Sequence, residues 1–199
     1  MNFRWIRVAL LALVAVLPAS AQDTLPGSRI TNAGVVRATV ATDSVFIART
    51  RTADTVDIGD FAAFLLAQIG APRFDDSLAF KVTSDTQRVR IAGRIMDFPA
   101  STRAELGPIF GFLDSTTVFV AEVSMPQADS GLLVFRLERL LVHGFPVPDI
   151  LVLGALAKYR AQYPKMLAAG GKEFLAAIPR DGRAALITNA IVLRMLPKP

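Results

Sequence analysis

Two stretches of alternating polar and apolar residues predict a β-hairpin. Residues 77–83 and 88–96 place apolar side chains at every second position, as a strand with one buried face requires. The four residues between them, Ser-Asp-Thr-Gln at 84–87, are typical of a tight turn. Further strand patterns occupy residues 116–124, 132–143 and 184–195, the last either as one strand or as a tight pair around Asn189.

Two other strand predictions carry finer detail. Residues 34–51 are rich in valine, threonine and isoleucine, and their partial alternation predicts two strands or one long strand bent near residues 42–44. Within residues 132–143, alternation predicts that Phe135, Leu137 and Leu141 point to the same face.

Apolar residues at helical spacing predict two helices in the first part of the chain. The first covers residues 61–69, with Asp57 or Asp60 capping its start and Gly70 its end. It has almost no polar face, so we expect it to be buried on most sides. The second lies within residues 99–114, where Gly107-Pro108 shortens, kinks or restarts it.

The segment His143-Gly-Phe-Pro-Val-Pro-Asp149 predicts an elbow between a strand and a third helix. Proline cannot continue a strand ladder, so the strand stops near His143, and Pro148 and Asp149 suit the first turn of a helix. This helix spans roughly residues 149–167, and residues 172–178 add a turn. Its first two turns have no polar side, so we expect it to start buried against the concave face of a curved sheet and to end amphipathic.

Together these elements predict an α+β fold, with a mainly antiparallel curved sheet of about seven strands wrapped on two or three helices. Residues 1–21 are expected to be a signal peptide, residues 22–33 a flexible lead-in, and residues 34–199 a single domain.

The N-terminal residues have the three parts of a secretory signal. Arg4 and Arg7 precede the apolar run 8–17, and Pro-Ala-Ser-Ala at 18–21 supplies a cleavage site near Ala21. The apolar run is shorter than the roughly 20 residues of a membrane-spanning helix. We therefore expect a periplasmic or secreted protein, with an uncleaved anchor as the alternative.

The composition excludes several kinds of site and partner. The chain has no cysteine, which excludes disulfides, thiolate catalysis and a lipidated cysteine. Loss of the two leader arginines lowers the formal net charge from +5 to +3, and the remaining positive charges are scattered, so no nucleic-acid partner is expected. A hydrophobic content of 52% exceeds the needs of an ordinary core and predicts a large core or an apolar cavity.

The polar residues give no pattern typical of an active site. His143 is the only histidine, and we expect it to be hydrogen-bonded locally, since a serine elbow and zinc ligands are lacking. Asp54, Asp57 and Asp60 recur every third residue, but without the glycine and distal glutamate of a calcium loop. We predict no catalytic residue, no metal and no cofactor, and an enzyme of unfamiliar type stays open as an alternative.

Arg88, Arg90 and Arg94 share one face of their predicted strand. They indicate either the solvated side of a half-exposed antiparallel sheet or a strip that binds anionic lipid headgroups by peripheral membrane contact.

The order of elements after residue 132 resembles that of bacterial secreted proteins of the YpmS and LmeA kind. The resemblance lies in the long strand ending in Gly144-Phe-Pro-Val-Pro148, the apolar helix, Ile178-Pro179 and the final aliphatic strand. It covers about a third of the chain. It implies a tubular lipid-binding fold, in which a sheet wraps a long helix and leaves a channel for an acyl chain, and it implies no catalytic residues.

These observations predict a non-enzymatic protein that binds a lipid or another long hydrophobic ligand in an apolar pocket between sheet and helices. The alternative is a structural or assembly protein of the cell envelope that binds a partner protein through an apolar patch. The candidate pocket residues, each of which could equally be plain core, are Phe61, Phe64, Leu65, Ile109, Phe110, Leu153 and Leu156.

Overall fold

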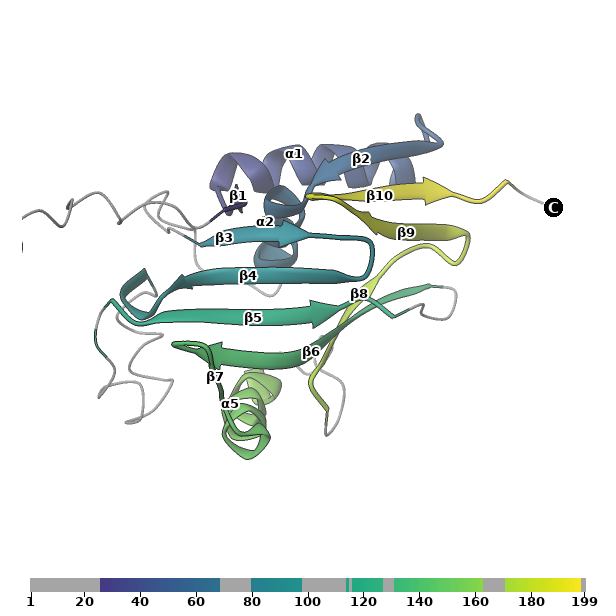
Figure 1. The fold of residues 1–199 in the computed structure, drawn as a ribbon. Helices are drawn as coiled ribbons and strands as arrows, with labels where there is room; N and C mark the ends of the chain where they lie inside the picture. Colours follow the sequence, from purple (N-terminus) through teal and green to yellow (C-terminus); the bar gives the residue numbers. More distant parts are fainter. Residues whose placement is uncertain are drawn as a thin grey trace, which may run out of the picture.

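The computed structural model describes residues 26–68, 80–97, 114, 116–126, 131–162 and 171–197. Within them the chain forms helices and two antiparallel sheets, which confirms the predicted α+β class (Figure 1). The main sheet has seven strands in the order β1-β3-β4-β5-β6-β7, with β8 also paired to β6, and it is not closed. Its strands are β1 (Ser28–Arg29), β3 (Lys81–Ser84), β4 (Arg88–Arg94), β5 (Val118–Ser124), β6 (Leu132–Val142), β7 (Phe145–Pro146) and β8 (Glu173–Ala177).

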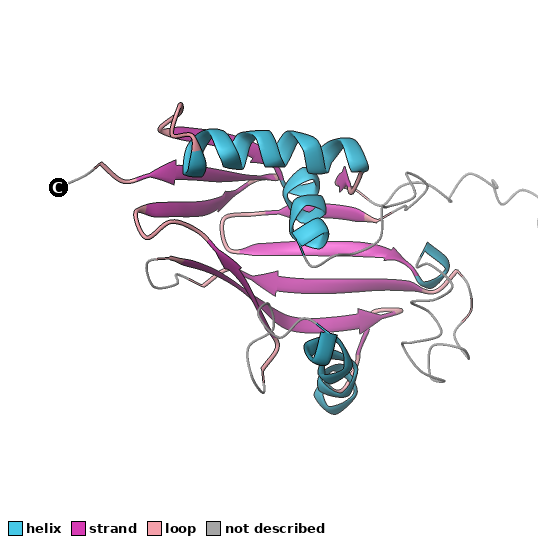
Figure 2. Cartoon of the chain, turned by 180° about the vertical axis from the view of Figure 1, so that it is seen from behind, coloured by secondary structure: helices cyan, strands magenta, loops and turns pink. Residues whose placement is uncertain are grey.

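The second sheet has three strands in the order β2-β10-β9. They are β2 (Ala53–Asp57), β10 (Ala190–Met195) and β9 (Gly182–Ile187). The α-helices are α1 (Asn32–Thr42), α2 (Ile58–Gln68) and α5 (Asp149–Gln162), accompanied by a π-helix at Asp43–Ile47 and a 3-10 turn at Ile95–Asp97. Helices α1 and α2 lie on one side of the molecule, and α5 lies beyond the β6–β7 edge of the main sheet (Figure 2).

A short hydrogen-bond network joins the two sheets. The Ser84 hydroxyl, at the end of β3, donates to the carbonyl oxygen of Ile187 at 2.7 Å. The backbone N–H of Asn189 donates to the carbonyl oxygen of Ser84 at 3.0 Å. Asn189 has φ = 54°, the left-handed conformation that asparagine tolerates in a tight turn. The predicted pair of strands around Asn189 is therefore confirmed as β9 and β10, and its turn anchors one sheet to the other.

The hairpin predicted around residues 84–87 is also confirmed. The Asp85 carboxylate accepts hydrogen bonds from the backbone N–H groups of Gln87 and Arg88, at 2.7 and 2.8 Å. These bonds hold the pKa of Asp85 below its ordinary value. The two strands pair antiparallel, with Ser84 opposite Val89.

Residues 34–47 are helical, so the prediction of strands over residues 34–51 was wrong. Thr31 caps α1 by accepting a hydrogen bond from the N–H of Gly34 at 3.0 Å. Gly34 and Ala38, one helical turn apart, are both buried. A methyl group on Gly34 would lie 2.5 Å from Oδ1 of Asp60, so the glycine lets α1 approach α2. Tertiary packing here overrides the β propensity of valine and threonine.

The same contact carries an ion pair. Arg37 of α1 forms a two-pronged salt bridge with the buried Asp60 of α2, with Nε–Oδ2 and Nη2–Oδ1 distances of 2.6 and 2.7 Å. Asp57 caps α2, because its Oδ1 accepts from the N–H groups of Gly59 and Asp60. Of the two predicted capping residues, Asp57 caps the helix, and Asp60 joins it to α1 through the salt bridge with Arg37.

Three further predictions need correction. Residues 173–177 form β8 paired with β6, not a helical turn. Leu141 does not share a face with Phe135 and Leu137, because a β-bulge at Glu138 shifts the register and sends Leu140 to their side instead. Helix α5 does not start buried: Asp149, Ile150 and Leu151 are exposed, and the first buried side chain is Val152.

The helix predicted within residues 99–114 lies outside the described residues, apart from Asp114.

Candidate functional site

One face of the main sheet is entirely apolar across its three central strands. Strand alternation and the pairing register show which side chains of β4, β5 and β6 lie on the same face as the buried Phe135. They are Val89, Ile91, Gly93, Phe119, Ala121, Val123, Leu133, Phe135, Leu137, Leu140 and Val142. Sheet pairing thus brings together an apolar surface that the linear sequence divides over three separate stretches.

The middle of this surface is incompletely covered. Ile91, Ala121 and Leu140 are directly paired neighbours on β4, β5 and β6, and all three side chains are only half-buried. The next paired row, Val89, Val123 and Leu137, is buried, with exposures of 6%, 9% and 8%. Ala121 is smaller than the residues on either side of it, and all three side chains pack against the buried core while keeping part of their surface exposed.

Helix α2 borders this surface through its aromatic residues. The ring of Phe61 lies 5.9 Å from that of Phe64 and 6.2 Å from that of Phe135 on β6. Phe61 is buried, so it acts as packing between α2 and the sheet. Phe64 and Leu65 are half-buried against the same core and present part of their surface beside it.

Helix α5 lies apart from α2, past the far edge of the sheet (Figures 1 and 2). Its Val152 joins the core and Leu156 packs against it half-buried, while Leu153 is also half-buried. The predicted pocket residues therefore form two groups, Phe61, Phe64 and Leu65 on α2 and Leu153 and Leu156 on α5, with the apolar strands between them. Ile109 and Phe110 lie outside the described residues.

The opposite face of the sheet carries the charged side chains. Glu122 of β5 is paired with Arg90 of β4 and Arg139 of β6. Its Oε1 accepts from Arg90 Nε at 3.0 Å and its Oε2 from Arg139 Nε at 2.6 Å, and Arg88 Nη1 lies 3.8 Å from Oε2. Glu122 is 2% exposed, although the three arginines are 52–60% exposed.

These contacts determine how Glu122 titrates. The hydrogen bond from Arg139, helped by that from Arg90, holds the pKa of Glu122 below its ordinary value against the opposing effect of burial. The sequence placed Arg88, Arg90 and Arg94 on one face correctly, but it did not indicate Glu122 or Arg139. Their partnership depends on the pairing of β5 with its two neighbours, which a single strand pattern does not specify.

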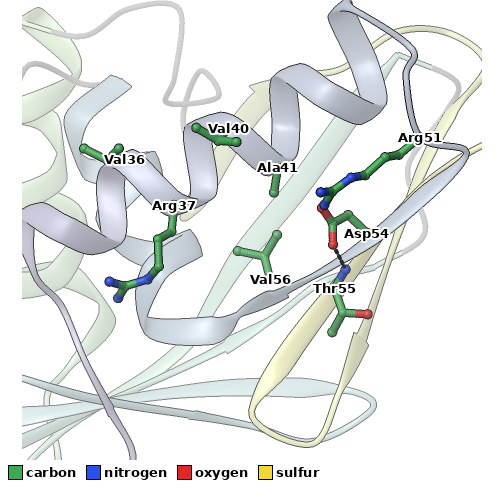
Figure 3. A pocket seen from close by; sticks show the side chains of 8 residues that line it. All are labelled: Val36, Arg37, Val40, Ala41, Arg51, Asp54, Thr55 and Val56. Atoms are coloured by element: carbon green, nitrogen blue, oxygen red, sulfur yellow. Dashed lines mark hydrogen bonds and ion pairs between the residues drawn. The ribbon is translucent and has the colours of Figure 1, made fainter.

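Two open pockets are lined by described residues. The first, of about 340 Å³, lies between α1 and β2 (Figure 3). It combines apolar side chains with a salt bridge between Arg51 and Asp54, and its lining residues are Val36, Arg37, Val40, Ala41, Arg51, Asp54, Thr55 and Val56. The second, of about 500 Å³, lies beside the Glu122 cluster and is lined by Gln87, Arg88, Glu122, Ser124, Glu138 and Arg139.

Several large apolar side chains are exposed on the surface, on α1 and at the elbow between β7 and α5 among other places. Val36, Val40 and Ile47 follow one face of α1 and its π-helical extension and are 63%, 58% and 74% exposed. Phe145 of β7 and Ile150 of α5 are 75% and 77% exposed at the elbow.

His143 sits in the two-residue turn between β6 and β7. His143 and Gly144 both have positive φ, 50° and 79°, as in a type I′ turn. The His143 ring nitrogen Nε2 lies 3.1 Å from the Thr117 hydroxyl oxygen, which confirms the predicted local hydrogen bond. Among the described residues, no group of three or more histidine, aspartate or glutamate side chains could hold a metal ion.

Comparison with protein-family models, with curated proteins and with solved structures finds no match for this chain. The fold and the surface chemistry are therefore the basis for a functional assignment. In the part of the chain that the structure describes, no helix has the length and apolar character needed to span a membrane.

Proposed function

We propose that this protein is a non-enzymatic carrier that binds a long hydrophobic ligand, such as a lipid acyl chain, on the apolar face of the main sheet. The observation that supports the proposal most directly is the half-buried row of Ile91, Ala121 and Leu140 in the middle of that face. An apolar surface left partly open to water lowers its free energy when a hydrophobic ligand covers it.

The surroundings of this row suit a ligand of that kind. Strands β4 to β6 contribute no polar side chain to this face, and Phe64, Leu65, Leu153 and Leu156 add half-buried apolar surface on either side. Helix α5 borders the surface from the sheet edge, so the proposal does not depend on insertion of that helix into the sheet. The secretion signal expected in residues 1–21 would deliver the carrier to the periplasm or the medium.

Enlarging Ala121 is expected to block the ligand. The Ala121→Phe variant should bind a fluorescent fatty acid at least tenfold more weakly than the wild type, because the new ring would cover the part of the row that the ligand is proposed to contact. Fluorescence titration measures the affinity, and mass spectrometry of the purified protein identifies lipids that co-purify. Circular dichroism shows whether the variant is folded.

Ala92→Phe is the matched control. Ala92 lies on the neighbouring strand but points to the opposite face, and it is half-buried like Ala121. It should bind as the wild type does. A wild-type protein that carries no lipid and binds no fatty acid would refute the carrier proposal, and equal binding by Ala121→Phe would refute this site.

A second candidate function is assembly with a partner protein of the envelope through the exposed stripe of Val36, Val40 and Ile47. Three large apolar side chains that are more than half exposed on one helical face are unusual for a solvated helix. Two of them, Val36 and Val40, line the pocket in Figure 3. A photo-crosslinking residue at Val40 should yield one discrete adduct in cells, abolished by Val36→Glu. Ile150→Glu, at a distant exposed site, should leave that adduct unchanged, and the lack of any discrete adduct would exclude this function.

A further inference from the structure

The charged face of the main sheet has a feature that the carrier proposal does not use. Three arginines from two strands, Arg88 and Arg90 on β4 and Arg139 on β6, converge on one carboxylate, Glu122. The pocket beside them is also lined by Gln87, Ser124 and Glu138. A solvated sheet face does not need a buried carboxylate, since removing a charge from water has a free-energy cost. What Glu122 achieves is to fix the positions of the guanidinium groups around it.

The donors in this cluster outnumber the acceptor sites. Arg90 uses Nε and Nη2 on Oε1 of Glu122, and Arg139 uses Nε on Oε2. Arg88 approaches only to 3.8 Å, beyond hydrogen-bond range. Since each guanidinium carries five N–H donors, most donors of the three arginines are not directed at Glu122. Arg88 and Arg139 line the pocket, so they can direct donors into it.

Charge defines the class of ligand. The three arginines and Glu122 sum to +2, and Glu138 on the pocket rim reduces the sum to +1. Glu138 accepts a hydrogen bond from the Ser124 hydroxyl at 2.5 Å, and this hydroxyl would turn towards an incoming anion. Guanidinium groups held in fixed planes suit the oxygen pairs of a phosphate group.

We propose that the pocket formed by Arg88, Arg139, Ser124 and Gln87, with Glu122 as the residue that positions the arginines, binds a phosphate monoester group. The group can belong to a lipid headgroup or to a small soluble phosphate. The site lies on the opposite side of the sheet from the proposed acyl-chain surface, so each proposal can be tested without the other.

The test measures binding of phenyl phosphate by titration calorimetry, and of vesicles of phosphatidylcholine with or without 20 mol% phosphatidic acid by co-sedimentation. The wild type is expected to bind phenyl phosphate, or the phosphatidic acid vesicles, or both; vesicle binding alone would identify a lipid headgroup as the source of the phosphate. Arg88→Gln should weaken this binding about tenfold. Glu138→Gln should strengthen it three- to tenfold, because it removes the repelling charge on the rim, an effect that a purely structural cluster would not show.

Arg49→Gln is the control for net charge. Arg49 pairs with Asp181 on another part of the surface and is 47% exposed, so its loss changes the total charge as Arg88→Gln does without touching the pocket. Equal weakening by both variants would show that binding is non-specific and would overturn the site. Absence of binding to both probes, or a Glu138→Gln variant that binds no more tightly than the wild type, would overturn it as well.

Discussion

Replacing Gly93 with alanine is expected to lower the free energy of unfolding by about 1–3 kcal/mol, the range typical of overpacking in a tight core. A methyl group at this position would lie 2.3 Å from Cδ1 of Phe80 and 3.1 Å from Cε1 of Phe119, whose rings pack edge to face at 5.6 Å. Both rings are buried, so they cannot move aside cheaply. Urea denaturation followed by circular dichroism measures the change.

Gly154→Ala provides the opposite result with the same chemical change. Gly154 lies in α5, is exposed, and has no atom within 4 Å of the position of an added methyl group. Alanine there should stabilise the protein by about 0.5–1 kcal/mol, because it restricts the unfolded chain without a clash. A Gly93→Ala variant as stable as the wild type would show that the packing described around Gly93 is wrong.

Replacing Glu122 with glutamine is expected to cost about 1–3 kcal/mol at pH 7, less than for a fully buried ion pair because its arginine partners are half exposed. The cost should depend on pH. The pKa of Glu122 in the folded protein lies below the ordinary value of 4.5, so its charge contributes stability above that value and loses it as the pH falls through the folded pKa. The difference between wild type and Glu122→Gln should therefore shrink from pH 7 to pH 3.

Glu138→Gln serves as the control for this experiment. Glu138 is exposed on the same face, and its loss should change stability by less than about 0.5 kcal/mol. Chemical denaturation at the two pH values measures both variants. A constant difference between wild type and Glu122→Gln at pH 7 and pH 3 would contradict the assigned role of the carboxylate.

The sequence predicted those elements in which the periodicity reflects local contacts. The hairpin of β3 and β4, helix α2 and the β9–β10 pair each have turn or capping residues inside their own segment, such as Asp85, Asp57 and Asn189. Helix α1 was missed because its residues favour strands individually, and its helical state depends on the contact of Gly34 and Arg37 with Asp60, which lies in the next helix.

The site was less predictable than the fold. The α2 and α5 residues were recognisable as apolar helical faces, but the row of Ile91, Ala121 and Leu140 exists only through the register of three strands. That register includes the bulge at Glu138, which reverses the facing of Leu140 and Leu141 and which no sequence signal indicated.

The pairing of β2 with β10 has a consequence for the order in which the protein can assemble. Residues 53–57 find their only strand partner in residues 190–195 among the described strands, so an early segment of the chain completes its sheet with one of the last. Such distant pairing closes a very long loop and is slow to form. A ribosome that still holds residues 182–195 therefore keeps the second sheet from forming.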